Sequence, residues 1–435
     1  MLDIAPLWPL RYRTTSLGEV ISPPYDVINP ELRKRLGERH PHNVVHIDLP
    51  EGEGDAKYQR AKELFEVWQR EGVLIREEQP AFFRYTQTFT PPGGGRRITR
   101  RGFFAAVRAV PFSDRVVLPH ERTLDGPKLD RIRLTRATRA ALSPQFMLYS
   151  DPGSTLDPLL DAGGPVTELV TDDGIEHHLS PVRDPAAVAT IRRTLRDGTL
   201  LIADGHHRYE TAVAISGEFQ AEARAGHAPV NERAEYLFTF AFLANGDDPG
   251  LVVFPTHRLV HSLGQFDWDA LLSRAGDVFS VSAHTGSIEN LLARLAEQKS
   301  PAVAAVASGG RAALLVLRPE ARLAEHPVLS HRPEVLRATD VVLLHDGILE
   351  HILGISPDAQ AKKTNLRYLQ EPQAGLEALD RGQGQVLFLM NATDVATVRR
   401  VAEAGEVMPQ KSTFFYPKVP TGLFFHTLYA ERSIP

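Results

Sequence analysis

The segment from residue 184 to residue 216 most restricts the folds open to this chain, because it alternates a helix, a strand and a second helix. It reads DPAAVATIRRTLRDGTLLIADGHHRYETAVAIS. Its pattern predicts a helix from about residue 185 to Asp197-Gly198, a short apolar strand at 199–203, a turn at Asp204-Gly205, and a helix after that turn. Helices that alternate with strands are typical of α/β and α+β proteins. The segment therefore predicts a fold of this kind.

The rest of the chain extends this pattern. An amphipathic helix is predicted at 54–72, and two strands joined by a PPGGG turn are predicted at 81–90 and 96–110. Further on, the strand-like runs AALLVL and QVLFLM alternate with helix-like runs. We therefore expect an α/β or α+β fold with mixed sheets and helices in two lobes. The first lobe, residues 1–245, carries the motifs described below, and residues 246–435 form a second α/β lobe packed against it.

Composition narrows the class of protein. The chain has 435 residues, a formal net charge of -5 and no cysteine. Without cysteine, disulfides, thiolate nucleophiles, zinc–thiolate sites and iron–sulfur clusters are excluded. The near-neutral charge balance argues against a dedicated nucleic-acid binder, which usually carries a strongly basic domain. The N-terminal stretch lacks the pattern of a secretory signal and no apolar run is long enough for a membrane span, so we expect a cytoplasmic protein.

The turn after the predicted strand concentrates ionisable residues beside a helix start. Asp204 and Gly205 are followed by His206, His207 and Arg208. Backbone N–H groups at a helix start and the helix dipole favour an anion. Gly205 permits a close backbone approach, and Arg208 can grip a phosphate with two parallel bonds. The simplest functional interpretation is a phosphate or nucleotide cradle.

Two other interpretations of this turn stay open. Asp204, His206 and His207 could ligate a divalent ion, with Glu210 nearby. Adjacent histidines on a turn usually point apart, however, and the common helical zinc motif places its two histidines four residues apart. The turn could also be purely structural.

A second group of ionisable residues lies in LPHERTLDGPKLDRIRLTRATRA, residues 118–140. His120 and Glu121 come where a strand passes into a loop, and Lys128 and Arg131 begin a basic stretch. Glu121 is a candidate general base, provided that the fold brings it within hydrogen-bond reach of a substrate hydroxyl. Lys128 and Arg131 are candidate phosphate-binding residues. The ordinary alternative is a solvated basic face on a surface helix.

Two shorter motifs supply weaker candidates. ISPPYDVI places Tyr25 and Asp26 after a rigid Pro-Pro pair, where they could bind substrate, although most such turns are structural. MPQKSTFFYPK offers Lys411 and Ser412 as phosphate donors, but it lacks the glycine framework of a P-loop. The histidines of PTHRLV and LLHDGILEH favour packing or capping roles over a site.

Five motifs together resemble the domain-of-unknown-function family DUF1015, and the likeness runs nearly end to end. They are ISPPYDVI, the 118–144 stretch that ends in RATRAALSP, IADGHHRYETA, FPTHRLV and MPQKSTFFYPKVPTG. LPHE followed later by DGHHR is similar, more distantly, to the free-serine kinases of the ParB/sulfiredoxin-like superfamily. That resemblance implies a ParB/sulfiredoxin-like nucleotide-binding element. It also implies that Glu121 is the catalytic base and that residues 204–208 form the phosphate loop.

These features together predict a nucleotide-dependent phosphotransferase, a kinase that acts on a small hydroxyl metabolite. L-serine is the leading substrate candidate, and the same site could run in reverse on phosphoserine. The catalytic candidates are Glu121, His120 and Asp204, and the expected cofactor is ATP or ADP with Mg²⁺. The expected partners are the nucleotide and the substrate, without nucleic acid or membrane. The alternatives are a metal-dependent hydrolase that uses Asp204, His206 and His207, and a non-enzymatic nucleotide-binding regulator.

Overall fold

The computed structural model describes residues 1–123 and 125–435, and the chain forms two compact units. Both units combine helices with a sheet, so the predicted α/β or α+β class is confirmed. The chain passes from the first unit to the second after Val252, and Pro417–Pro435, which the sequence assigns to the second lobe, belongs to the first unit. The first unit contains Met1–Pro119, Thr123–Val252 and Pro417–Pro435, and the second contains His120–Arg122 and Val253–Tyr416.

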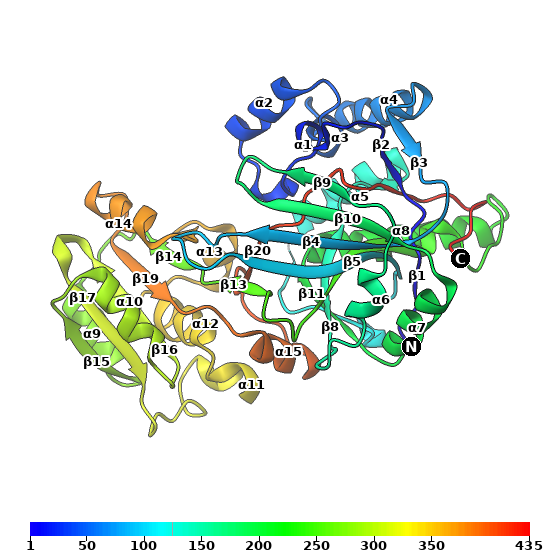
Figure 1. Cartoon of the computed structure of the whole chain (residues 1–435). Helices are drawn as coiled ribbons and strands as arrows, with labels where there is room; N and C mark the ends of the chain where they lie inside the picture. The colour runs from blue at the N-terminus through cyan, green and yellow to red at the C-terminus, as the bar shows by residue number, and fades with distance from the viewer. Residues whose placement is uncertain (124) are drawn as a thin grey trace. The chain divides into compact units, whose positions relative to one another are not determined.

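The first unit is built around a nine-stranded mixed sheet (Figure 1). Its strand order is β6-β11-β8-β12-β5-β4-β10-β9, and β1 also pairs with β5. The β6–β11 and β8–β12 pairs are parallel. Strand β12 reads FTFAFLAN and is buried along its length, as expected for a strand covered on both faces. The bounds are β1 Ile4–Ala5, β4 Phe82–Phe89, β5 Ile98–Arg108, β6 Val117–Leu118, β8 Gln145–Tyr149, β9 Thr167–Val170, β10 Glu176–Val182, β11 Leu200–Asp204 and β12 Phe238–Asn245.

The helix predicted from about residue 185 is confirmed as α7. The Asp184 carboxylate caps it by accepting the backbone N–H of Ala187 at 2.8 Å, and Pro185 occupies its first turn. The remaining elements of this unit are α1 Leu17–Val20, η1 Tyr25–Val27, α2 Pro30–Arg39, α3 Val45–Asp48, α4 Ala56–Arg70, η2 Phe112–Asp114, α5 Asp125–Thr138, α6 Asp157–Asp161, α7 Pro185–Leu195, α8 His206–Arg224, η3 Glu235–Leu237, and the short strand pairs β2 Leu10–Tyr12 with β3 Leu74–Arg76 and β7 Ala140–Ala141 with β21 His426–Thr427.

The second unit contains a six-stranded antiparallel sheet in the order β15-β17-β16-β19-β14-β18. The segment VVLLHDGILEHIL is helical, with π-helical geometry over Leu343–Glu350, a rare geometry that is frequent at functional sites. The bounds are β13 Val252–Phe254, β14 His257–Val260, β15 Phe279–His284, β16 Ala302–Ala307, β17 Ala312–Leu317, β18 Leu366–Leu369, β19 Val386–Met390, β20 Phe414–Tyr416, α9 Trp268–Ala275, α10 Ile288–Ala296, η4 Ser308–Gly310, η5 Leu329–His331, α11 Glu334–Arg337, α12 Asp340–Val342, η6 Leu343–Glu350, α13 Pro357–Lys362, α14 Pro372–Asp380 and α15 Val395–Glu403.

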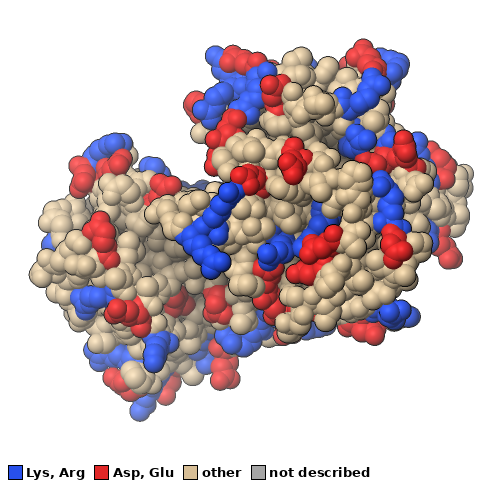
Figure 2. Space-filling view, viewed as in Figure 1, with Lys and Arg blue, Asp and Glu red and all other residues tan. Residues whose placement is uncertain are grey.

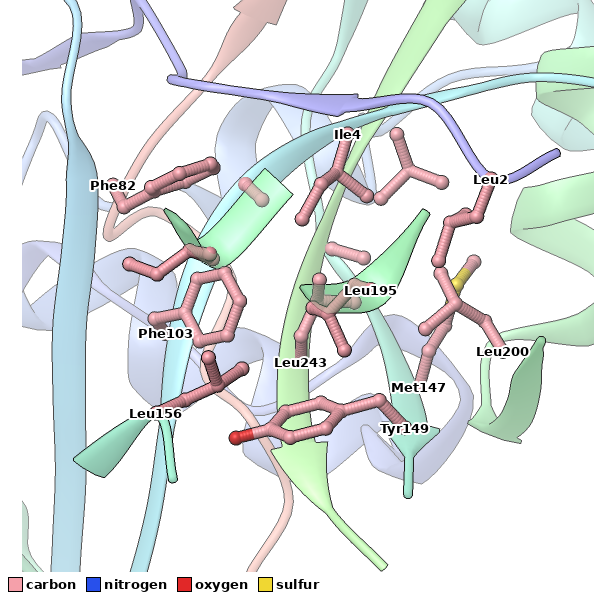
Figure 3. Packing of buried hydrophobic residues seen from close by; sticks show 14 of the residues in the cluster. Leu2, Ile4, Phe82, Phe103, Met147, Tyr149, Leu156, Leu195, Leu200 and Leu243 are labelled. Atoms are coloured by element: carbon pink, nitrogen blue, oxygen red, sulfur yellow. The ribbon is translucent and has the colours of Figure 1, made fainter. Parts of the chain in front are cut away.

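An apolar cluster joins the sheet of the first unit to helix α7. Ile191 and Leu195 of α7 share it with Phe103, Met147 and Leu243 from three neighbouring strands. Figure 3 shows these strand side chains and Leu195 pointing toward one another. Full burial of one such side chain contributes about 1.5–3 kcal/mol. Leu200 and Ile202 of β11 belong to the same cluster, so it also holds the strand that ends at Asp204.

The C-terminal segment, Pro417–Pro435, completes the first unit. Phe425 and Leu10 exchange two backbone hydrogen bonds, each of 2.9 Å. The Phe424 ring lies 4.5 Å from the Phe83 ring, measured between centroids. The last residues of the chain thus pack against its first strands.

Basic and acidic side chains are interspersed on the face drawn in Figure 2, in keeping with the near-neutral net charge of -5. Within the described ranges, every helix is too short or too polar to cross a lipid bilayer.

Candidate functional site

The predicted strand, glycine turn and helix form the centre of the candidate site. Strand β11 ends at Asp204, Gly205 follows in a left-handed conformation with a φ of 95°, and α8 begins at His206. A Cβ atom on Gly205 would meet the Arg208 guanidinium carbon at 3.0 Å. Both the positive φ and this close approach require glycine. Gly205 has no side chain to cap α8, so the start of this helix depends on other donors and acceptors.

Gly205→Ala is expected to destabilise the first unit by about 1–3 kcal/mol, because alanine is strained at this φ and would push against Arg208. Gly217→Ala is the matched control. It lies inside the same helix, and a Cβ there meets no atom within 4 Å. The control should be neutral or stabilising by about 0.5–1 kcal/mol. Urea unfolding of both variants measures the difference, and equal stability would contradict the geometric requirement at Gly205.

Arg208 anchors the turn from within the protein. Its side chain is 8% exposed. Its Nη1 atom donates to Ser143 Oγ at 2.9 Å and to the Pro144 carbonyl, and its Nη2 atom donates to the Asp204 carboxylate. Arg208 therefore supplies positive charge to the turn, while its two Nη atoms already serve protein acceptors.

Asp204 joins two cations. One carboxylate oxygen accepts from Arg208 and the other from Lys418 Nζ. Lys418 belongs to the motif MPQKSTFFYPKVPTG, but its distance in sequence from Asp204 gives no local signal of the pairing. The lysine is thus a candidate that the sequence patterns do not identify.

His206 is buried and His207 is half-buried at the first turn of α8. Among residues 1–123 and 125–435, no group of three or more His, Cys, Asp or Glu side chains is placed to hold a metal ion. The metal-ligand interpretation of Asp204, His206 and His207 therefore gains no geometric support.

Two basic candidates on α5 are paired with carboxylates in the same unit. Lys128 Nζ lies 3.0 Å from Glu210 Oε2. Arg131 is 6% exposed, and its Nη1 atom donates to Asp48 Oδ1 at 3.0 Å. The alternative of a solvated basic face is therefore wrong for Arg131. Its guanidinium also lies 4.3 Å from the centroid of the Tyr25 ring, which brings two of the predicted residues into contact.

A cavity of about 40 Å³ lies beside α8 in the first unit, which is enough for about three water molecules. Tyr25, Arg131 and Arg208 contribute to its lining. Two buried polar atoms in the lining, Asp48 Oδ2 and Thr211 Oγ1, have no hydrogen-bond partner in the described structure. Burial raises the pKa of the Asp48 carboxyl, and the nearby Arg131 and Arg208 charges oppose this rise.

Tyr25 and Asp26 occupy the short helix η1 at this edge of the unit. Burial raises the pKa of the Tyr25 hydroxyl to about 12, so the group is neutral at physiological pH. Asp26 is exposed. Only Tyr25 of this predicted pair lines the cavity.

The remaining candidates, His120, Glu121, Lys411 and Ser412, belong to the second unit. The Glu121 carboxylate accepts three backbone N–H groups, from Lys411 at 3.2 Å, Ser412 at 3.0 Å and Thr413 at 3.4 Å. His120 Nε2 lies 2.8 Å from Thr413 Oγ1. The LPHE and QKST motifs therefore meet, and Glu121 holds the turn at Lys411, whose φ is 57°.

Arg258 holds the same turn from the carbonyl side. It is 1% exposed, and its Nη2 atom donates to the Lys411 carbonyl at 3.0 Å. Its Nε atom donates to His345 Nε2 at 3.1 Å, and His345 Nδ1 lies 2.7 Å from Gln360 Oε1. His257 Nδ1 accepts the backbone N–H of Met390 at 3.1 Å. Both predicted histidines are interior residues, in agreement with packing roles.

Solved structures with similar backbones share little sequence with this chain. A conserved hypothetical protein from Pyrococcus furiosus is 15% identical, with a TM-score of 0.35, covering 71% of this chain and 91% of that chain. A free serine kinase in complex with AMP is 13% identical, with a TM-score of 0.35, covering 71% and 89%. SbnI from Staphylococcus aureus, with a C-terminal truncation, is 10% identical, with a TM-score of 0.35, covering 74% and 86%. Similarity at this level assigns neither a substrate nor an activity to this chain.

Sequence comparison is more specific. No curated protein matches the chain. A family model described as a protein of unknown function, DUF1015, matches residues 4–342, which is more than half of the chain. The protein therefore belongs to the DUF1015 family, as its motifs predict.

Proposed function

We propose that this protein is a nucleotide-dependent phosphotransferase that acts on a small hydroxyl compound, with the 204–208 turn as its phosphate site. The observation that carries the proposal is the end of β11, where one carboxylate, Asp204, is held between the cations of Arg208 and Lys418 at the start of α8. A helix start with cationic side chains beside it is a favourable place for phosphate. Phosphoryl transfer depends mainly on positioning and charge stabilisation, which such a turn can supply.

The cavity beside α8 is the proposed subsite for the polar end of the substrate. Asp48 Oδ2 is an acceptor without a partner, and Thr211 Oγ1 can donate or accept. A small hydroxyl or amino compound satisfies both groups. L-serine is the leading candidate because LPHE and DGHHR are similar to the motifs of free-serine kinases, and phosphoserine is the substrate for the reverse direction.

ATP or ADP with Mg²⁺ is the proposed cofactor. Mg²⁺ in such sites is held largely by substrate phosphates and water with one or two carboxylates, so a dedicated protein cage is not required. Glu121 is the proposed general base, and His120 beside it is a proposed catalytic residue. Three backbone donors hold the Glu121 carboxylate in one orientation within the second unit. This part of the proposal is independent of the phosphate turn and has its own test.

Thermal unfolding with ATP, ADP or pyrophosphate, each with Mg²⁺, and with Zn²⁺ or Mn²⁺ alone tests the proposal. A ligand that binds only the native state stabilises it by about 2.7 kcal/mol at one hundred times its Kd. We expect a shift with nucleotides, followed by transfer of phosphate from ATP to L-serine in a ³¹P NMR assay. A shift with metal alone would favour the metal-dependent hydrolase, and nucleotide binding without any product would favour the regulator.

His207→Ala should weaken nucleotide binding about tenfold, because it removes a polar side chain beside the phosphate turn. His227→Ala is the matched control, since His227 is exposed beyond the other end of the same helix. Titration calorimetry with ADP compares the two variants. Equal affinities in both would place the nucleotide away from the start of α8.

A further inference from the structure

Arg100 is a buried cation with unused donors. It lies on β5 and is 1% exposed. Its Nη2 atom donates to Gln87 Oε1, but Nε and Nη1 are buried without a hydrogen-bond partner in the described ranges. Its guanidinium carbon lies 4.5 Å from the centroid of the Phe146 ring and 5.3 Å from that of Phe242. Buried polar atoms are nearly always paired in native proteins, so these two donors require an explanation.

The charge of Arg100 is only partly balanced. Burial lowers the pKa of the guanidinium to about 10, and electrostatic interactions with Tyr85 and then with Asp204 oppose this shift. Arg100 is therefore still cationic at neutral pH. Asp204 also contacts Arg208 and Lys418, so its charge acts on three cations of the described structure. A buried charge without a full counter-charge is costly, and an anion bound at the turn would reduce this cost.

Gln87 links Arg100 to Lys418. The Gln87 carboxamide accepts from Arg100, and its Nε2 atom donates to the backbone carbonyl of Lys418 at 3.1 Å. The Lys418 side chain is 17% exposed, against 8% for Arg208. Of the three cations, Lys418 is thus the one with the most access to a ligand.

We propose that Lys418 is a phosphate-binding residue of the 204–208 turn, and that Arg100 is a positioning residue that acts on it through Gln87. The inference rests on the proposed function and names the cation that receives the ligand. The ligand class is a diphosphate or triphosphate group. Asp204 holds the ammonium group of Lys418 in place, and the bound phosphate shares that ammonium group with Asp204.

The direct test is titration calorimetry with inorganic pyrophosphate in EDTA. Lys418→Met is expected to weaken pyrophosphate binding at least about tenfold, the loss that follows from removal of one hydrogen bond between charged groups. Lys34→Met is the control, because the Lys34 side chain is 78% exposed and pairs only at 3.8 Å with Glu38. This control should bind within about twofold of the wild type. Equal binding by Lys418→Met and Lys34→Met overturns the inference.

Asp204→Asn gives a test that does not depend on the folding of the lysine variant. Asparagine keeps an oxygen that can accept from Lys418, so the ammonium group stays in place while the competing negative charge is removed. Binding of pyrophosphate in EDTA should therefore tighten several-fold, because the same cations then face less negative charge. Unchanged or weaker binding by Asp204→Asn would contradict the proposed arrangement.

Arg100→Met separates positioning from simple structural support. Replacement of a buried, incompletely paired charge by an apolar side chain should leave the thermal midpoint equal or higher, while pyrophosphate affinity falls about threefold to tenfold. Arg101→Met is the matched control, since Arg101 is the next residue of the strand and its side chain is 45% exposed. A variant that loses stability but keeps its affinity would show that Arg100 is structural only.

The outcomes distinguish this inference from the function on which it rests. If the wild type binds neither pyrophosphate nor any nucleotide, the proposed function fails and the inference fails with it. If the wild type binds and Lys418→Met matches its control, only the role of Lys418 is wrong.

Discussion

Glu121→Gln is expected to lower the rate of phosphoryl transfer by roughly 10²–10⁴-fold, the usual contribution of a general base, while ADP affinity stays within about twofold. Glutamine keeps one acceptor oxygen but cannot remove a proton from a hydroxyl group. The amide N–H of glutamine would also face a backbone N–H of the 411–413 turn, where the Glu121 carboxylate now accepts. The nearest of these backbone donors are Ser412 at 3.0 Å and Lys411 at 3.2 Å. Single-turnover kinetics at saturating nucleotide measure the loss.

Asp394→Asn is the matched control for Glu121→Gln. Asp394 caps α15 in the same unit, where its carboxylate accepts the backbone N–H of Thr397 at 2.8 Å. Asparagine is an equally good cap, so this variant loses the same charge without losing stability or turnover. Full turnover by Glu121→Gln would exclude Glu121 as the base. A lowered thermal midpoint with unchanged turnover per folded molecule would show that Glu121 stabilises the 411–413 turn and takes no part in catalysis.

Acidification from pH 6.5 to pH 4 is expected to destabilise the second unit strongly. Burial lowers the pKa of His345 to about 3 and that of His257 to about 4. Both histidines are neutral in the folded protein. Their contribution to the free energy of unfolding is therefore fully present above the unfolded pKa of about 6.5, and it is lost as pH falls toward the pKa values of the folded state. By pH 4 this loss lowers the free energy of unfolding by on the order of 3 kcal/mol for each histidine. Asp340 partly offsets this loss, because burial raises the pKa of its carboxyl to about 6 and protonation then favours the folded state.

His345→Gln isolates one of these groups. Glutamine can still donate to Gln360 and accept from Arg258, but it does not titrate. The stability difference between the wild type and this variant, measured by urea unfolding at pH 7, 5.5 and 4.5, should therefore shift in favour of the variant as the pH falls. A difference that is constant over this range would show that His345 does not titrate between the folded and unfolded states.

Local sequence patterns predicted the strand, glycine turn and helix around Gly205, because each of these choices acts over a few neighbouring residues. The apolar run ends at Asp204, glycine supplies the positive φ, and the helix follows at once. The buried state of His257 and His345 was predictable for the same reason, since both lie in apolar stretches.

The partners of this turn could not be predicted in the same way. Lys418 reaches Asp204 across 214 residues of sequence, and Gln87 on the neighbouring strand links Arg100 to Lys418. No periodicity records such pairings, which follow from sheet register and from the return of the C-terminal segment. Arg131 illustrates the same limit, because the local pattern leaves a solvated basic face open as an alternative, whereas Asp48 and Tyr25 cover this side chain in the folded unit.

The return of Pro417–Pro435 to the first unit has a consequence for biosynthesis. The sheet of that unit is translated early, but the segment that carries Phe424, Phe425 and Lys418 leaves the ribosome only after the whole second unit. Until then Asp204 lacks its contact with Lys418, and Phe83 lacks its contact with Phe424. A nascent chain therefore passes through a long stage in which it exposes apolar surface, the situation in which chaperones are needed. The contact between Asp204 and Lys418 forms only after residues 253–416 have been synthesised.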